Sequence, residues 1–212
     1  MALRIFIGWD SREPECADVL RYSLEKHSSI PLDIRYLKLP ELDFDRPWDP
    51  LQSTEFTYTR FLVPSLCDYQ GKAVFMDCDM LCLGDIRELD ELPMEDLALR
   101  VVKHDHRPTE KTKMDGKVQT VYPRKNWSSL MLMNCAELGL WRKRVVEMAS
   151  GAYLHRFQEI PDEKIGEIPI LLFTSLQCFD CLLPFGNVLQ ISIKGYTSIL
   201  QFDRIGSEYD PF

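Results

Sequence analysis

The chain has 212 residues, of which 45% are hydrophobic and 27% are charged, and its formal net charge is -8. This composition supports a packed core and excludes a wholly disordered chain, and the length predicts one main domain. The acidic balance argues against a broad nucleic-acid surface, because phosphate binding depends on clustered lysine and arginine. No apolar run approaches the roughly 20 residues that a membrane-spanning helix needs, so we expect no transmembrane segment.

The first residues and the cysteines indicate a cellular compartment. The N-terminus leads straight into an apolar run without the layout of a signal peptide. The seven cysteines are odd in number, and several, such as Cys82 and Cys135, lie inside apolar stretches. This distribution favours reduced thiols over a disulfide framework. We therefore expect a cytoplasmic protein.

Strands and helices are predicted to alternate through the N-terminal part of the chain. Short apolar runs predict strands, and apolar residues at helical spacing predict helices. The predicted strands are residues 4–8, 32–37, 73–76, 97–102 and 129–134. The predicted helices are residues 14–27, 55–66 with Ser53 or Thr54 as the cap, and 141–150. This alternation favours an α/β fold with a mostly parallel sheet, and the polar stretch 104–124 is long enough to be a functional loop.

Two Asp-x-Asp motifs occur in the chain, and their contexts differ. Asp43 and Asp45 lie in a proline-rich segment that is typical of a solvated turn. Asp77 and Asp79 directly follow the predicted strand 73–76. Carboxylates at the carboxyl end of a buried parallel strand face the crevice where α/β sheets bind ligands, and their hard oxygens suit Mg²⁺ or Mn²⁺ bound to a diphosphate. The alternative is that these two residues only cap the following turn.

Four short segments stand out in order along the chain. They are residues 4–10 (RIFIGWD), 58–64 (YTRFLVP), 73–86 (AVFMDCDMLCLGDI) and 128–134 (SSLMLMN). Together they resemble the ordered sequence blocks of glycosyltransferase family 8, the glycogenin and bacterial galactosyltransferase type. The resemblance implies a GT-A-type fold, a mixed and mostly parallel sheet flanked by helices, as a transferase core over residues 1–169. It stops near residue 170, so residues 170–212 are expected to form a divergent C-terminal tail.

The resemblance also implies an activity. Members of this family move a sugar from a nucleotide-sugar donor to a hydroxyl group, with retention of configuration at the anomeric carbon. We expect a UDP-sugar as donor, Mn²⁺ or Mg²⁺ as cofactor, and a glycan, lipid or protein as acceptor. A divalent ion and an arginine suit this chemistry, because charge develops on the departing diphosphate.

Residues for the donor carry over one by one from the family pattern. Gly8, Asp10 and Arg12 match the loop that holds the nucleoside. Arg60 matches an arginine that reaches the donor sugar and phosphate. Asp105 lies near a position that contacts the donor sugar. The resemblance therefore implies a donor site made of these five residues.

The metal and catalytic residues carry over in the same way. Asp77 and Asp79 match the metal-binding pair of the family. Asp162 and Glu163 match a pair that stands beside the anomeric carbon. The resemblance therefore implies that the first pair holds the ion and the second carries out catalysis.

Two departures from the family pattern affect the expected activity. Trp127, Ser128 and Ser129 stand where the family has an asparagine, a small residue and a glycine. The family also has a late histidine as a third metal ligand, and no histidine follows His155 here. Losing a ligand leaves the ion less able to neutralise the departing diphosphate, so we expect slow turnover with nucleotide binding retained.

Two alternatives to an active transferase remain at this point. A pseudo-transferase would bind the nucleotide-sugar without turning it over. A haloacid-dehalogenase-type phosphatase also begins with a strand followed by Asp-x-Asp, but that motif lies near the N-terminus, and Met80 stands where threonine or valine is usual.

Overall fold

A computed structural model describes residues 2–103, 124 and 127–169 with their side chains, and the backbone of four strands beyond them. These four strands are β8 (Leu176–Cys178), β9 (Asp180–Cys181), β10 (Val188–Ile193) and β11 (Tyr196–Gln201). The predicted functional loop therefore lies outside the described residues except for Arg124. No helix in the described part of the chain combines the length and apolar character that crossing a bilayer requires.

A six-stranded sheet forms the centre of the molecule. Its strands are β1 (Leu3–Gly8), β2 (Leu32–Leu37), β3 (Lys72–Met76), β5 (Leu99–Val101), β6 (Leu130–Asn134) and β7 (Ile165–Glu167). Their order is β2-β1-β3-β6-β5-β7. β1 is parallel to β2 and β3, and β5 is parallel to β7, whereas β6 is antiparallel to both of its neighbours. The predicted mixed, mostly parallel α/β sheet is confirmed.

The strand register decides which loops lie at the same edge. Met76, at the end of β3, pairs with Leu130 at the start of β6, and Val101, at the end of β5, pairs with Met131. The strands β1, β3, β5 and β7 therefore end at one edge, which we call the carboxyl edge. β7 begins at the other edge, because Ile165 pairs with Leu99 at the start of β5.

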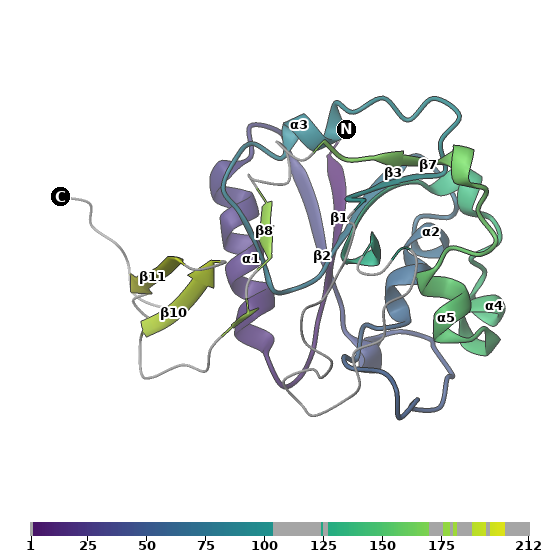
Figure 1. Cartoon of the computed structure of the whole chain (residues 1–212), viewed down its shortest axis with the longest axis horizontal. Coiled ribbons are helices and arrows are strands. Elements are labelled where there is room, and N and C mark those ends of the chain that lie inside the picture. The colour runs from purple at the N-terminus through teal and green to yellow at the C-terminus, as the bar shows by residue number, and fades with distance from the viewer. Residues whose placement is uncertain are drawn as a thin grey trace.

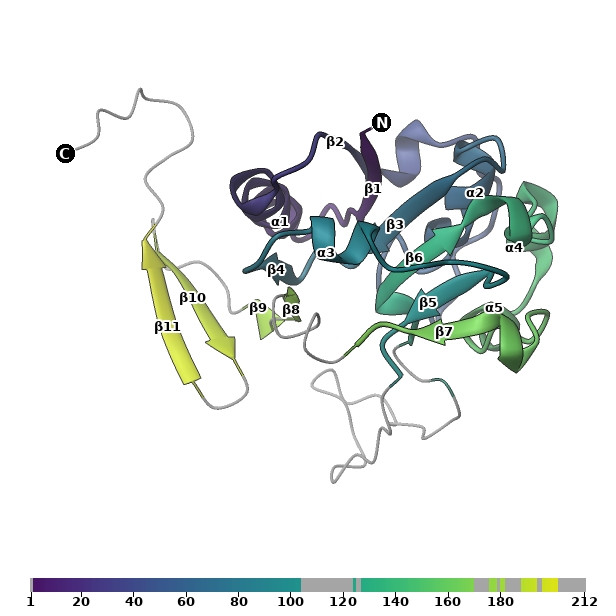
Figure 2. The same cartoon turned by 90° about the horizontal axis from the view of Figure 1, so that it is seen from above.

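Helices cover both faces of this sheet (Figures 1 and 2). α1 (Pro14–His27) and α3 (Arg87–Asp90) lie on one face, with the short strand β4 (Met80–Cys82), which pairs with β8. α2 (Val63–Leu66), α4 (Lys143–Met148) and α5 (Gly151–His155) lie on the other face. The last strands form a separate three-stranded sheet in the order β11-β10-β9.

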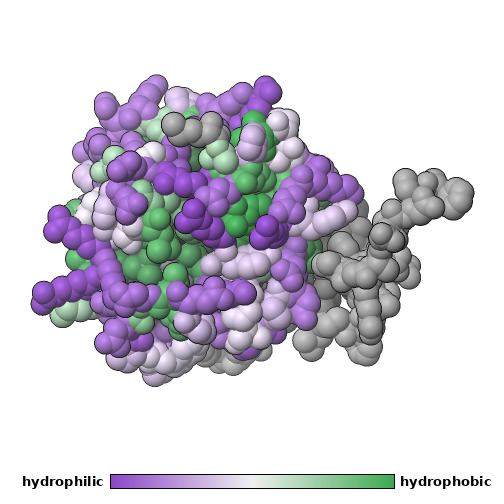
Figure 3. Space-filling view, turned by 180° about the vertical axis from the view of Figure 1, so that it is seen from behind, coloured by the Kyte–Doolittle hydropathy of each residue, from purple (hydrophilic) through white to green (hydrophobic). Residues whose placement is uncertain are grey.

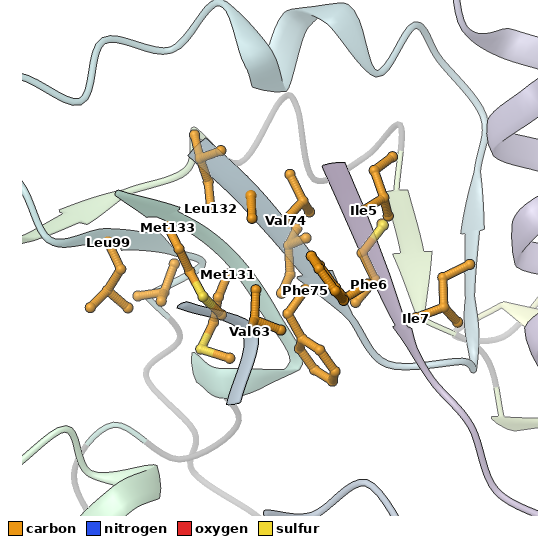
Figure 4. Packing of buried hydrophobic residues seen from close by; sticks show 14 of the residues in the cluster. Ile5, Phe6, Ile7, Val63, Val74, Phe75, Leu99, Met131, Leu132 and Met133 are labelled. Atoms are coloured by element: carbon orange, nitrogen blue, oxygen red, sulfur yellow. The ribbon is translucent and has the colours of Figure 1, made fainter. Parts of the chain in front are cut away.

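The core consists of apolar side chains between these layers. Side chains from β1, β3 and β6 converge there with Val63 of α2, and Figure 4 shows Phe6, Phe75 and Met131 among them. Each is at most 1% exposed. Burying a side chain of this size contributes about 1.5–3 kcal/mol, so the three central strands form a rigid platform for the loops at the carboxyl edge.

Apolar side chains that are not buried in the core are visible on the face behind that of Figure 1. Hydrophilic side chains border and cross the hydrophobic areas on this face (Figure 3). Leu51 and Met148 are the most exposed of the large apolar side chains described, at 87% and 75%. They belong to the loop after β2 and to α4 rather than to the central sheet.

One predicted helix is wrong, and two short helices, α3 and α5, were not predicted. Residues 55–58 form turns, followed by the 3₁₀ helix η2 (Thr59–Leu62) and then α2. Pro64 lacks the N–H that a continuous helix through this segment would need, and α2 begins with this proline in its first turn. The predicted helix over 141–150 is α4, and α5 follows it because Ser150 caps a new helix by accepting from Tyr153 N at 3.1 Å.

Candidate functional site

Asp77 and Asp79 lie where β3 ends, at the carboxyl edge. The Asp77 N–H donates to the Ser129 carbonyl at 2.9 Å, which continues the pairing with β6 one residue beyond the strand. The pKa of Asp77 is raised to about 7, because burial and, to a smaller extent, the negative charge of Asp79 raise it by more than the Arg60 guanidinium lowers it. The two carboxylates are therefore close enough to repel each other.

A buried arginine faces this carboxylate pair. Arg60 Nη1 lies 2.8 Å from Asp77 Oδ1, and only 7% of the Arg60 side chain is exposed, compared with 21% of the Asp77 side chain. Such a pair in a desolvated position is strongly oriented, since either charge alone would be costly to bury. The structure thus brings together one predicted donor residue and one predicted metal ligand.

The Arg60 guanidinium is held on several sides. Its Nε donates to the Phe56 carbonyl at 3.3 Å, and its Nη1 donates to the Ser128 carbonyl at 2.8 Å. Its Cζ lies 5.2 Å from the ring centre of Phe56 and 4.9 Å from that of Phe75, within the range of cation–π attraction. These contacts fix the guanidinium toward Asp77.

The loop after β1 carries a second buried carboxylate. Asp10 is 2% exposed and accepts four hydrogen bonds, from the backbone N–H of Arg12 and Glu55 and from Nε and Nη2 of Arg12, at 2.7–3.2 Å. Burial alone would raise the pKa of Asp10, but these hydrogen bonds lower it overall. Both oxygens are engaged within the protein, so Asp10 orients the loop, while 61% of the Arg12 side chain is exposed.

Residues 53–60, which we call the strap, connect this loop to the carboxylate pair. Glu55 contacts Asp10 at one end of the strap, and Arg60 contacts Asp77 at the other. The Phe56 ring lies directly over Gly8, where a side chain would collide with it. Four predicted site residues on the first loop and the strap, Gly8, Asp10, Arg12 and Arg60, are thus joined to Asp77 through the strap.

The predicted catalytic pair lies elsewhere in the described structure. Asp162 and Glu163 are exposed and belong to the 3₁₀ helix η5 (Asp162–Lys164), which leads into the start of β7. Lys164 also lies 3.4 Å from Glu137, which follows the end of β6, away from the carboxyl edge. Asp162 forms an ion pair with Arg124. The structure does not bring this pair together with Asp77, and Asp105 lies outside the described residues.

Comparison with known proteins decides the family. The sequence profile "Glycosyl transferase family 8" matches residues 24–176. The chain belongs to glycosyl transferase family 8. We therefore prefer a transferase to the phosphatase alternative, which depended only on a strand followed by an Asp-x-Asp motif.

This family 8 chain is also similar to a plant protein and to solved glycosyltransferase structures. Protein CDI of Arabidopsis thaliana is 48% identical over 174 residues, which cover 79% of this chain and 67% of that protein. Among solved structures, the glycosyltransferase GlyE of Streptococcus pneumoniae TIGR4 has a TM-score of 0.51 at 15% identity, covering 79% of this chain and 45% of that one. The bifunctional glycosyltransferase WbbM has a TM-score of 0.53 at 14% identity, covering 80% and 39%. These two structures support the GT-A fold, and this chain spans less than half of either.

The family 8 carboxylate pair fits a divalent cation. Asp77 and Asp79 supply hard oxygen ligands, and their mutual repulsion would be relieved by a positive ion between them. Across residues 2–103, 124 and 127–169, no group of three or more metal-ligating side chains gathers. Asp77 and Asp79 are the side chains of the described structure that could hold such an ion.

Ser128 and His155 belong to this site although they carried no predicted role in it. Ser128 supplies the carbonyl that holds Arg60, and its hydroxyl lies 2.8 Å from His155 Nδ1. Burial and the neighbouring Arg60 charge lower the pKa of His155 to about 3, so the ring is neutral. The sequence signal that points to them is the departure from the family pattern at residues 127–129.

Proposed function

We propose that this chain transfers a sugar from a nucleotide-sugar donor, expected to be a UDP-sugar, to a hydroxyl group of a glycan, lipid or protein. The observation that carries the proposal is the pairing of Arg60 with Asp77 beside Asp79 at the carboxyl edge. A ligand-binding crevice in an open α/β sheet lies at this edge. Membership in family 8 supports a sugar as the transferred group.

Each residue of the site has a part in the proposed mechanism. Asp77 and Asp79 would hold Mn²⁺ or Mg²⁺, which when bound neutralises charge on the leaving diphosphate. Arg60 favours the ionised form of Asp77 and orients this carboxylate, because its guanidinium is fixed by two backbone carbonyls. Asp10 orients the loop on which Arg12 is exposed toward solvent.

The proposed mechanism assigns no step to the predicted pair Asp162 and Glu163. Retention at the anomeric carbon is proposed from the family resemblance. Asp162 pairs with Arg124, whose Cζ lies 5.9 Å from the ring centre of Trp127 just before β6. The catalytic role of Asp162 and Glu163 stays a prediction from the resemblance.

Turnover with a panel of nucleotide-sugars tests the proposal. Release of UDP from UDP-sugars should depend on Mn²⁺ and should be lost in Asp79→Ala. The matched control is Asp45→Ala, in the other Asp-x-Asp motif, whose side chain is exposed. Donor binding without any turnover would identify a pseudo-transferase, and failure to bind any nucleotide-sugar would contradict the proposal.

A further inference from the structure

Two separate segments hold Arg60, one on each side. The strap contributes the Phe56 carbonyl, 3.3 Å from Nε, and the 3₁₀ helix η3 (Trp127–Ser129) contributes the Ser128 carbonyl, 2.8 Å from Nη1. The same Nη1 faces Asp77 at 2.8 Å. The direction of the guanidinium therefore depends on the relative position of these two segments.

His155 connects the two segments. This last residue of α5 places Nδ1 2.8 Å from the Ser128 hydroxyl, and its ring lies beside that of Tyr58 in the strap, with ring centres 6.5 Å apart. The edge of the ring packs against Phe61, with ring centres 5.0 Å apart. One neutral imidazole thus ties together both of the segments that present carbonyls to Arg60.

α5 is itself positioned against the strap. Ser150 caps its first turn, and a Cβ on Gly151 would lie 3.1 Å from the Tyr58 hydroxyl, so the helix approaches the strap closely at this glycine. The position of His155 is consequently set by the packing of α5 rather than by a flexible loop.

We propose that His155 and Ser128 are positioning residues that hold Arg60 toward Asp77. Through this arrangement they fix the orientation of a carboxylate that would bind the divalent ion. The consequence for the ion rests on the proposed function, whereas the positioning of Arg60 does not.

A double-mutant cycle tests the positioning directly. The free energy of unfolding in urea is measured for the wild type, Asp77→Asn, His155→Leu and the double variant. Asp77→Asn changes the unfolding equilibrium constant by some factor in the wild type and by another factor in His155→Leu. We expect these two factors to differ about fivefold or more, as they do for residues that belong to one hydrogen-bond network. A difference below about twofold would overturn the proposal. If His155→Leu does not fold, the same cycle is run with Ser128→Ala, which removes only the hydroxyl.

A matched histidine provides the control. His27 lies on α1, on the other face of the sheet, and its Nδ1 contacts the Ser23 carbonyl at 2.9 Å. The effects of His27→Leu and Asp77→Asn should add, because the two residues share no hydrogen-bond partner in the described structure. If His27→Leu were coupled to Asp77→Asn as strongly as His155→Leu is, the specific role of His155 would be overturned.

The affinity for Mn²⁺ alone separates positioning from general stability. His155→Leu should raise the Mn²⁺ dissociation constant about tenfold, as loss of an outer-shell partner does, and His155→Asn, whose amide can still meet the Ser128 hydroxyl, should restore it. Coupling in the cycle with unchanged Mn²⁺ affinity would overturn the claim that His155 fixes the orientation of the ion-binding carboxylate. A wild type that does not bind Mn²⁺ would contradict the proposed metal site, and the cycle alone would then decide the positioning of Arg60.

Discussion

Gly8 and Phe56 are in contact where β1 ends: a Cβ built on Gly8 would lie 2.5 Å from Cδ2 of the Phe56 ring. Phe56 in turn packs against Phe75 of β3, with ring centres 6.3 Å apart, and presents its carbonyl to Arg60. The glycine thus permits the strap to lie across the ends of β1 and β3. This contact links the loop that carries Asp10 to the carboxylate that follows β3.

Gly8→Ala should destabilise the protein. The Phe56 ring is buried and cannot move away freely, so we expect an overpacking cost of about 1–3 kcal/mol in the free energy of unfolding. Urea denaturation measures this change. Gly139→Ala is the matched control, because its Cβ would meet nothing within 4 Å and its φ is -61°. Equal stability of the two variants would contradict the close approach at Gly8.

Asp10→Asn should also lower the free energy of unfolding. An amide cannot accept all four hydrogen bonds that the buried carboxylate receives, so we expect a loss of about 1–3 kcal/mol. Asp33→Asn is the control, because Asp33 forms the same fork with Arg35 two residues on, at 2.8 Å, but both side chains are at least 36% exposed. This control should change stability by less than about 1 kcal/mol. A similar loss of unfolding free energy in both variants would show that the contribution of Asp10 to stability does not depend on its burial.

Part of this architecture could be predicted from the sequence. Five of the six strands of the central sheet follow from short apolar runs, whereas β7 was not predicted. Asp77 and Asp79 follow from a motif directly after one of these runs. The strap was not predicted, because the apolar spacing of residues 55–66 favours a helix although Pro64 lies inside this range. Nor was the contact of Ser128 with His155, 27 positions apart, since it depends on the packing of α5 against η3. Local periodicity carries no signal for either feature.

The buried His155 predicts a dependence of stability on pH. Its pKa is about 3 in the folded protein, compared with 6.5 ordinarily, so below pH 6.5 the unfolded chain binds a proton that the folded protein does not. The stability that the neutral ring contributes is present above pH 6.5 and is lost as pH falls toward 3, with a slope of at most about 1.4 kcal/mol per pH unit.

His155→Gln isolates this contribution. Glutamine does not titrate, so the stability difference between wild type and variant should shrink by about 2 kcal/mol between pH 7 and pH 5. Urea denaturation at both values measures it. Parallel stability curves for the two proteins would show that His155 titrates normally in the folded state.

The affinity for UDP with and without Mn²⁺, measured by isothermal titration calorimetry, tests the central claim most directly. If Asp77 and Asp79 form a divalent-ion site for a diphosphate, Mn²⁺ should tighten UDP binding to the wild type by about tenfold or more, or about 1.4 kcal/mol. Asp79→Ala should abolish this gain, and Asp45→Ala should keep it. Equal UDP affinity of the wild type with and without Mn²⁺, or a full gain in Asp79→Ala, would contradict the account.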